Sequence, residues 1–92
     1  IVSFADKATE SIANGERVVR FAFIENSIRR KLRMLEIANN LNDLRIPPGN
    51  HREKLQGNWC DFYSIRVNEQ WRICFRWTAK GPTDVQLVDY HK

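Results

Sequence analysis

Hydrophobic and polar residues alternate over residues 63–77, and this is the clearest pattern in the chain. Two series of apolar residues at every second position are separated by a polar segment: Tyr63, Ile65 and Val67, then Trp71, Ile73, Phe75 and Trp77. A period of two is typical of a strand with one face in a core. The pattern therefore predicts a β-hairpin, with residues 68–70 as its turn.

The two apolar series also predict how the strands pair. Opposed residues of an antiparallel pair point to the same face, and placing Val67 opposite Trp71 gives every apolar residue an apolar partner. This register places Arg66 opposite Arg72, with Arg76 further along the same face. Opposed like charges destabilise a sheet, so the arginines suggest a bound phosphate, whose oxygens match the guanidinium fork. The alternative is a solvated face on which the arginines spread apart.

Two helices are predicted before the hairpin. Asp6 is a suitable N-cap for a short helix over residues 7–14, closed by Asn14-Gly15. Residues 16–23 fit either a strand or the entry to the next helix. From about residue 25 to residue 40, apolar residues form one helical stripe, which comprises Ile24, Ile28, Leu32, Leu35 and Ala38. The opposite face is either solvated or a contact for nucleic acid or an acidic partner, and it carries Arg29, Arg30, Lys31 and Arg33.

The remaining segments complete a small mixed fold. Residues 1–4 are β-prone, residues 45–51 form a loop because they contain two consecutive prolines, and residues 85–88 supply a last strand. The predicted order is β-α-α-β-β-β. This order indicates an α+β fold, with a small antiparallel sheet and two helices packed on one face. The length of 92 residues fits one domain over residues 1–92.

The net charge and the cysteines indicate which kind of partner and which cellular compartment to expect. The chain has 15 Lys and Arg against 11 Asp and Glu, and this net charge of +4 favours an anionic partner. No apolar run is long enough for a transmembrane helix, and no signal peptide is visible. Cys60 and Cys74 lie too far apart along the hairpin to form a disulfide, so a reduced, cytoplasmic protein is expected. Neither a zinc-like Cys/His spacing nor a carboxylate cluster for Mg²⁺ is evident, and we expect no cofactor.

Three functional side chains follow the last predicted strand. His91 titrates near neutral pH and can transfer a proton, Asp89 could orient it or act as a base, and Tyr90 offers a face for stacking an RNA base. RNA can be cleaved without a metal when its 2′-hydroxyl attacks the adjacent phosphodiester, which requires a base, an acid and cations on the phosphate. Together with Arg66 and Arg72, the three residues cover these roles. The alternative is a polar chain end without function.

Three segments closely resemble the HigB branch of the RelE/ParE toxin superfamily: residues 55–57 (Leu-Gln-Gly), 63–75 (Tyr-Ser-Ile-Arg-Val-Asn-Glu-Gln-Trp-Arg-Ile-Cys-Phe) and 85–91 (Val-Gln-Leu-Val-Asp-Tyr-His). The predicted helix also resembles the family's second helix over residues 29–35. The resemblance implies a microbial ribonuclease fold and a type II toxin that cleaves messenger RNA on the translating ribosome. It also implies a HigA-type helix-turn-helix antitoxin, through which the complex would bind operator DNA.

The resemblance also implies roles for individual residues. Arg66 and Arg72 would bind or neutralise the scissile phosphate, and residues 89–91 would supply acid–base and stacking groups. The candidate catalytic residues are His91, Asp89, Tyr90, Arg72, Arg66 and Lys54. The candidate RNA-binding residues are Arg66, Arg72, Arg76, Lys54 and His51.

One motif departs from the family pattern. Many members carry His-x-x-Leu/Val-Lys-Gly before the hairpin, and its His and Lys contribute to catalysis. Here Glu53 stands in place of the His and Gln56 in place of the Lys, with Lys54 and His51 nearby but off position. Whether Lys54 reaches the site depends on whether this segment is a strand or a loop. We predict weaker or context-limited cleavage than in members with the full motif, and equal turnover in a side-by-side ribosome assay would refute this.

Two other functions stay open at this point. A ParE-like gyrase inhibitor shares the fold but has no nuclease site, and both Arg72 and the Asp89-Tyr90-His91 end argue against it. A non-catalytic RNA-binding or antitoxin-docking module would bind without cutting. If chemistry is the mechanism, His91→Gln and Arg72→Ala should both relieve toxicity, whereas a gyrase inhibitor should tolerate His91→Gln.

Overall fold

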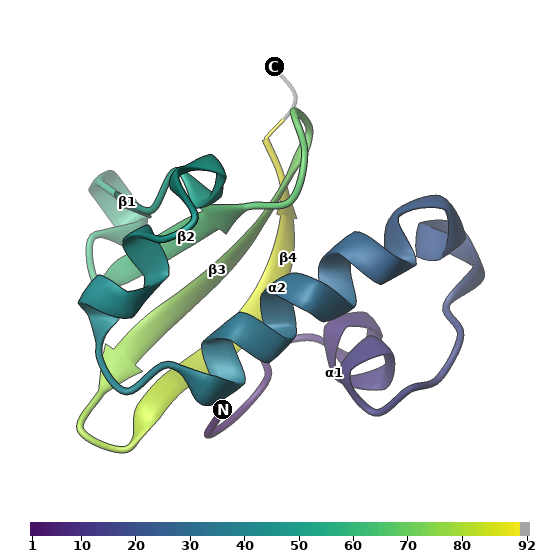
Figure 1. Ribbon diagram of the computed structural model, residues 1–92, viewed down its shortest axis with the longest axis horizontal. Coiled ribbons are helices and arrows are strands. Elements are labelled where there is room, and N and C mark those ends of the chain that lie inside the picture. Colours follow the sequence, from purple (N-terminus) through teal and green to yellow (C-terminus); the bar gives the residue numbers. More distant parts are fainter. Residues whose placement is uncertain (91–92) are drawn as a thin grey trace.

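The computed structural model describes residues 1–90, which form two α-helices and a four-stranded antiparallel sheet (Figure 1). Its elements are α1 (Lys7–Ala13), α2 (Glu25–Ile37), β1 (Glu53–Lys54), β2 (Phe62–Arg66), β3 (Trp71–Thr78) and β4 (Gly81–Asp89). The strand order is β1-β2-β3-β4, so each strand pairs with its neighbour along the chain. The predicted α+β fold class is confirmed. No helix within the described residues is long and apolar enough to cross a membrane.

The central hairpin pairs in the predicted register. Ile65 lies opposite Ile73, and Arg66 lies opposite Arg72. The turn is held by Asn68, whose Oδ1 accepts hydrogen bonds from the backbone N–H groups two and three residues later, at 2.8 and 2.7 Å. The alternation of residue types therefore separates the hairpin into an apolar face and a face that carries the arginines.

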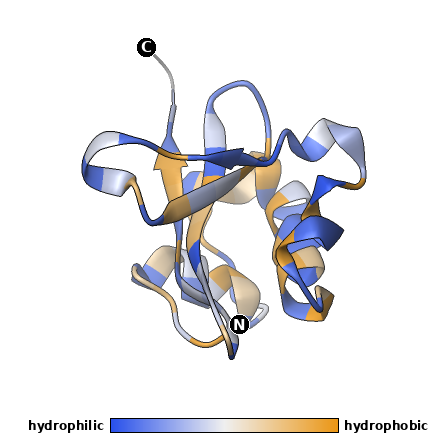
Figure 2. Cartoon of the chain, turned by 90° about the vertical axis from the view of Figure 1, so that its left-hand side faces the viewer, coloured by the Kyte–Doolittle hydropathy of each residue, from blue (hydrophilic) through white to orange (hydrophobic). Residues whose placement is uncertain are grey.

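The helices cover the apolar face of the sheet, and apolar positions recur along the strands and both helices (Figure 2). The buried residues of the core are Ile12, Phe21, Ile28, Leu32, Leu35, Leu44, Ile65, Ile73, Phe75 and Val85. Each such side chain contributes roughly 1.5–3 kcal/mol through removal from water. Because the helices occupy one side of the sheet, the face of β2 and β3 that bears the arginines lies on the other side.

The predicted start of α1 is confirmed, and the ambiguous segment after it is a 3₁₀ turn over Val19–Ile24. Asp6 caps α1 by accepting a hydrogen bond from the Thr9 N–H at 2.6 Å, and Gly15 follows the helix with φ +87°. The second helix ends at Ile37, three residues before the predicted end, because the backbone at Ala38 is extended.

The predicted N-terminal strand is reduced to a single parallel bridge between Phe4 and Val85. The backbone of this segment still follows β4, with Val2 N–H donating to the Pro82 carbonyl at 2.7 Å. A register shift interrupts the β3–β4 pairing here, and Asp84 adopts a left-handed conformation with φ +53°. Such a bulge bends a strand, and residues 2–5 run beside β4 at this irregular point.

The basic face of α2 has partly structural roles. The guanidinium of Arg29 donates to the carbonyls of Ile12 and Glu16, at 3.2 and 3.1 Å, and so ties α2 to the end of α1. Arg30 and Arg33 are exposed. The sequence predicted that four basic residues form a solvated or partner-binding face. Arg30 and Arg33 lie on such an exposed face.

Asn50 anchors the proline-containing loop beneath α2. Its side chain is fully buried, its Nδ2 donates to the Leu44 carbonyl at 3.1 Å, and its Oδ1 accepts from Lys31 Nζ. Burial, together with the nearby Arg30, lowers the pKa of Lys31. Lys31 therefore supports the loop rather than a solvated helix face.

The Asn50→Ala variant should lower the free energy of unfolding by about 1–3 kcal/mol, because a buried carbonyl and an ammonium group lose their partner. Urea denaturation would measure the loss. Asn42→Ala removes an exposed amide and should change stability by less than about 0.5 kcal/mol. Equal effects of the two substitutions would contradict the anchoring role.

Candidate active site

Arg72 lies at the centre of the polar face of the hairpin, and only 7% of its surface is exposed. Its Nε donates to Ser64 Oγ at 2.7 Å, and its Nη2 donates to the backbone carbonyls of Ser64 and His51. These acceptors are neutral, and no carboxylate among residues 1–90 forms an ion pair with Arg72. The structure therefore fixes the guanidinium in place while leaving its positive charge available to an anion.

Arg66 and Arg72 line the same cavity. They are directly opposed across β2 and β3, and Arg66 forms no hydrogen bond or ion pair with the other described residues. The cavity has a volume of about 290 Å³, and its other lining residues are His51, Glu53, Asn68, Glu69 and Tyr90. Two guanidinium groups that line one cavity are an arrangement suited to binding a phosphate.

Tyr90 closes this cavity at the end of β4. Its ring lies next to the Arg72 guanidinium, with 5.5 Å between the ring centroid and Cζ. Burial is the main cause that raises the pKa of Tyr90; Cys74 and Glu53 add to the rise, and Arg72 opposes it. The phenol therefore stays protonated at neutral pH, so it can donate a hydrogen bond or a proton.

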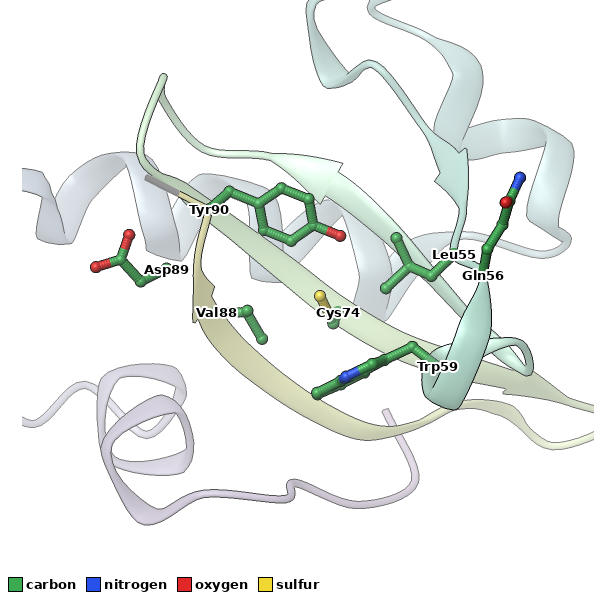
Figure 3. A pocket seen from close by; sticks show the side chains of 7 residues that line it. All are labelled: Leu55, Gln56, Trp59, Cys74, Val88, Asp89 and Tyr90. Carbon is green, nitrogen blue, oxygen red and sulfur yellow. The ribbon is translucent and has the colours of Figure 1, made fainter. Parts of the chain in front are cut away.

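Tyr90 also lines a second, more apolar cavity (Figure 3). Its volume is about 370 Å³, and its lining residues are Leu55, Gln56, Trp59, Cys74, Val88, Asp89 and Tyr90. Cys74 and Val88 belong to β3 and β4 and form the floor, while Trp59 comes from the loop before β2. Tyr90 is thus shared by an arginine-lined cavity and an apolar one.

Cys74 is a buried thiol that is poorly suited to act as a nucleophile. Burial raises its pKa to about 12, although the nearby Arg72 opposes the rise. We expect one thiol of the native protein, the exposed Cys60, to react with Ellman's reagent at pH 8, and the second to react only after denaturation. A Cys60→Ser variant provides the control. Rapid labelling of that variant in its native state would contradict the expectation.

The register of β1 corrects the expected place of Lys54. Lys54 pairs with Tyr63, whose ring stacks on Phe75 on the core side of the sheet, whereas Glu53 pairs with Ser64 on the arginine side. The segment is a strand, and neighbouring strand residues point to opposite faces. Lys54 is therefore not gathered with the arginines, and a carboxylate takes the position beside them.

Two further candidate RNA-binding residues differ in their relation to the arginine pair. His51 lines the cavity, and its backbone carbonyl positions Arg72. Arg76 lies four residues beyond Arg72 on β3, which is about 13 Å along the strand, and its Nε is 3.2 Å from a carboxylate oxygen of Asp84. Arg76 thus forms an ion pair with Asp84, at the bulge of β4, and does not line the cavity.

The strand-end residues lie on different faces. Asp89 pairs with Trp71 and accepts a hydrogen bond from Gln70 Nε2 at 3.2 Å, and its carboxylate points away from Tyr90 (Figure 3). Tyr90 therefore lines the cavity that contains the two arginines, whereas Asp89 does not. His91 lies outside the described residues, so its predicted role stays a prediction.

Ser64 and Trp59 were not among the predicted site residues. Ser64 lies two positions before Arg66 on the same face, so the alternation offered a signal for its contact with Arg72. Trp59 lies in a 3₁₀ turn, where no periodic pattern indicates which way a side chain points. Among residues 1–90, no group of three or more His, Cys, Asp or Glu side chains could hold a metal ion.

The fold and site together define a small α+β protein with an arginine-lined cavity on the face of its sheet that the helices leave open. A family model described as the RelE-like toxin of type II toxin–antitoxin system HigB matches residues 3–91. The chain is 44% identical over 93 residues to a protein named Toxin HigB-1 from Vibrio cholerae serotype O1, covering 99% of this chain and 97% of that protein. It is also 46% identical over 60 residues to an uncharacterised protein from Haemophilus influenzae, covering 65% of this chain and 59% of that protein.

The chain therefore belongs to the HigB-like family of RelE-like toxins from type II toxin–antitoxin systems. Membership implies an antitoxin partner and, in general terms, a nuclease-type activity. The resemblance found in the sequence is confirmed at the level of the family.

Proposed function

We propose that the protein is a ribosome-dependent endoribonuclease that cleaves messenger RNA and thereby inhibits translation. One observation carries the proposal: Arg66 and Arg72 face one cavity, and Arg72 is held by neutral acceptors that leave its charge free for a phosphate. Opposed arginines are unfavourable in a sheet unless an anion lies between them. A phosphodiester of RNA supplies that anion.

The reaction proposed for this site needs no metal ion. The 2′-hydroxyl oxygen attacks the adjacent phosphorus, a base takes its proton, and the bond from phosphorus to the 5′-oxygen breaks as an acid protonates that oxygen. Arg66 and Arg72 would stabilise the negative charge that develops on the phosphoryl oxygens. Tyr90 is suited to the role of acid because its phenol stays protonated at neutral pH. His91, which follows Tyr90 in the sequence, is the proposed base.

The proposed partners follow from the family and from the charge of the site. The antitoxin would be of the HigA type, with a helix-turn-helix through which the complex binds operator DNA. The ribosome and messenger RNA would be the targets, which places the activity in the cytoplasm.

Primer extension on a defined messenger RNA, in a purified translation reaction with and without ribosomes, tests the proposal. We expect cuts in the wild-type reaction that require ribosomes. Growth arrest without any cut product, accompanied by inhibition of gyrase supercoiling, would instead support the ParE-like mechanism. Binding of RNA without cuts would support a non-catalytic module.

Glu53 is expected to slow the reaction, because it brings a negative charge into the cavity proposed for the phosphate. Glu53→Gln should raise the single-turnover cleavage rate by roughly 2–10-fold, since a charge pair across a few ångströms near a protein surface is worth on the order of 1 kcal/mol or more. Glu36→Gln removes an exposed carboxylate of α2 and should leave the rate unchanged. A lower rate in Glu53→Gln would contradict this prediction and would make Glu53 a candidate catalytic group.

A further inference from the structure

The apolar cavity next to Tyr90 has no role in the reaction described above. We infer that it is a nucleobase-binding subsite, which holds a base of the RNA beside the phosphate bound by Arg66 and Arg72. The inference rests on the proposed function and extends it, since it names the part of the substrate that this cavity takes. Three features of the cavity support it.

The first feature is its position relative to the arginines. Tyr90 lines both cavities, and Val88 on the floor of the apolar one lies directly opposite Arg72 in the β3–β4 pair. Cys74, the other floor residue, is two positions beyond Arg72, which is about 7 Å along the strand. A nucleoside attached to a phosphate at Arg72 therefore reaches the cavity without crossing any other element.

The second feature is the character of its walls. The rings of Trp59 and Tyr90 flank the cavity, with Cys74 and Val88 between them (Figure 3). Trp59 is 37% exposed, and an edge-on contact with Phe62, at 4.9 Å between ring centroids, supports its ring. Aromatic side chains beside a cationic groove are the common means by which proteins bind single-stranded RNA.

The third feature concerns the polar groups at the rim. The side chains of Gln56 and Asp89 point away from the middle of the cavity (Figure 3). A base bound here would be held by stacking and apolar contact rather than by hydrogen bonds to its edge. We therefore expect affinity for a base with little preference among the four bases.

An apolar side chain of the antitoxin is the other occupant that could fit such a cavity. The shared Tyr90 and the adjacent arginines favour RNA, because they place the cavity next to two guanidinium groups that form no ion pair with the other described residues. Antitoxin binding is therefore measured alongside RNA binding in the test.

The test is photocrosslinking of an oligoribonucleotide that contains 4-thiouridine to the full chain, both free and bound to ribosomes, with the crosslinked peptides identified by mass spectrometry. We expect crosslinks to Trp59, which lines only the apolar cavity, whereas Tyr90 lines both cavities. Crosslinks that do not include Trp59, or none in either setting, would overturn the inference. Crosslinks in the cavity without any cut product would uphold it while contradicting the proposed cleavage, so the two failures can be told apart.

Binding of the same oligonucleotide to variants gives the second readout. Trp59→Ala should weaken binding about ten-fold, as expected for the loss of one stacked base, whereas Trp59→Phe should retain most of it. Val88→Phe should also weaken binding, because it fills the floor. Phe23→Ala removes an exposed aromatic ring that lines neither cavity and is the matched control. If Trp59→Ala weakens antitoxin binding and leaves RNA binding unchanged, the inference is wrong.

Discussion

Replacing Arg72 with alanine should reduce the rate of ribosome-dependent cleavage on the order of 10²–10³-fold, as does the loss of a positioned donor to a developing negative charge. The size of the effect follows from the burial of Arg72 and from the hydrogen bonds that fix its guanidinium. Arg66→Ala should reduce the cleavage rate less, by about ten-fold. Arg66 is more exposed than Arg72 and is not held by hydrogen bonds to the other described residues.

Single-turnover cleavage on ribosomes would measure both rates, and urea denaturation would show whether each variant is folded. Arg76→Ala is the matched control, because Arg76 belongs to the same strand but pairs with Asp84 away from the cavity. Its rate should stay within about two-fold of the wild type. A folded Arg72→Ala protein that cleaves as fast as Arg76→Ala would show that the cavity does not hold the reacting phosphate.

Tyr90→Phe should have the second largest effect, a loss on the order of 10²-fold in the cleavage step, which is within the range for removal of a general acid. The substitution keeps the ring beside Arg72 and removes only the hydroxyl. Because burial raises the pKa of Tyr90, the wild-type rate should not fall through phenol ionisation as the pH rises from 6.5 to 8.5. Rates measured across this pH range would check both expectations.

Tyr63→Phe provides the control for Tyr90→Phe, because Tyr63 stacks on Phe75 on the core side of the sheet. Its rate should match that of the wild type. If Tyr90→Phe also cleaves at the wild-type rate, the ring alone matters at this position and the acid must be another group.

The hairpin and its arginine pair could be predicted from sequence because both depend on local alternation. A period of two determines which residues share a face, and matching apolar partners determines the register. The opposition of Arg66 and Arg72 follows directly from that register and is confirmed. The cap at Asp6 was predictable for the same reason, since it depends on residues close in the chain.

Other parts of the site depend on contacts that no local pattern encodes. The face taken by Lys54 depends on the pairing of a two-residue strand with β2, and Arg76 is engaged by a bulge in β4 that the apolar pattern does not reveal. The loop that brings the His51 carbonyl to Arg72 is positioned by the buried Asn50. Tertiary packing therefore decides which predicted residues meet.

The most direct test of the account is the chemistry of the RNA ends that the protein produces on ribosomes. Attack by the 2′-hydroxyl leaves a 5′-hydroxyl on the downstream fragment, so polynucleotide kinase should label that fragment without prior phosphatase treatment. The account predicts this result for the wild type and its loss in Arg72→Ala. A downstream fragment that carries a 5′-phosphate would contradict it.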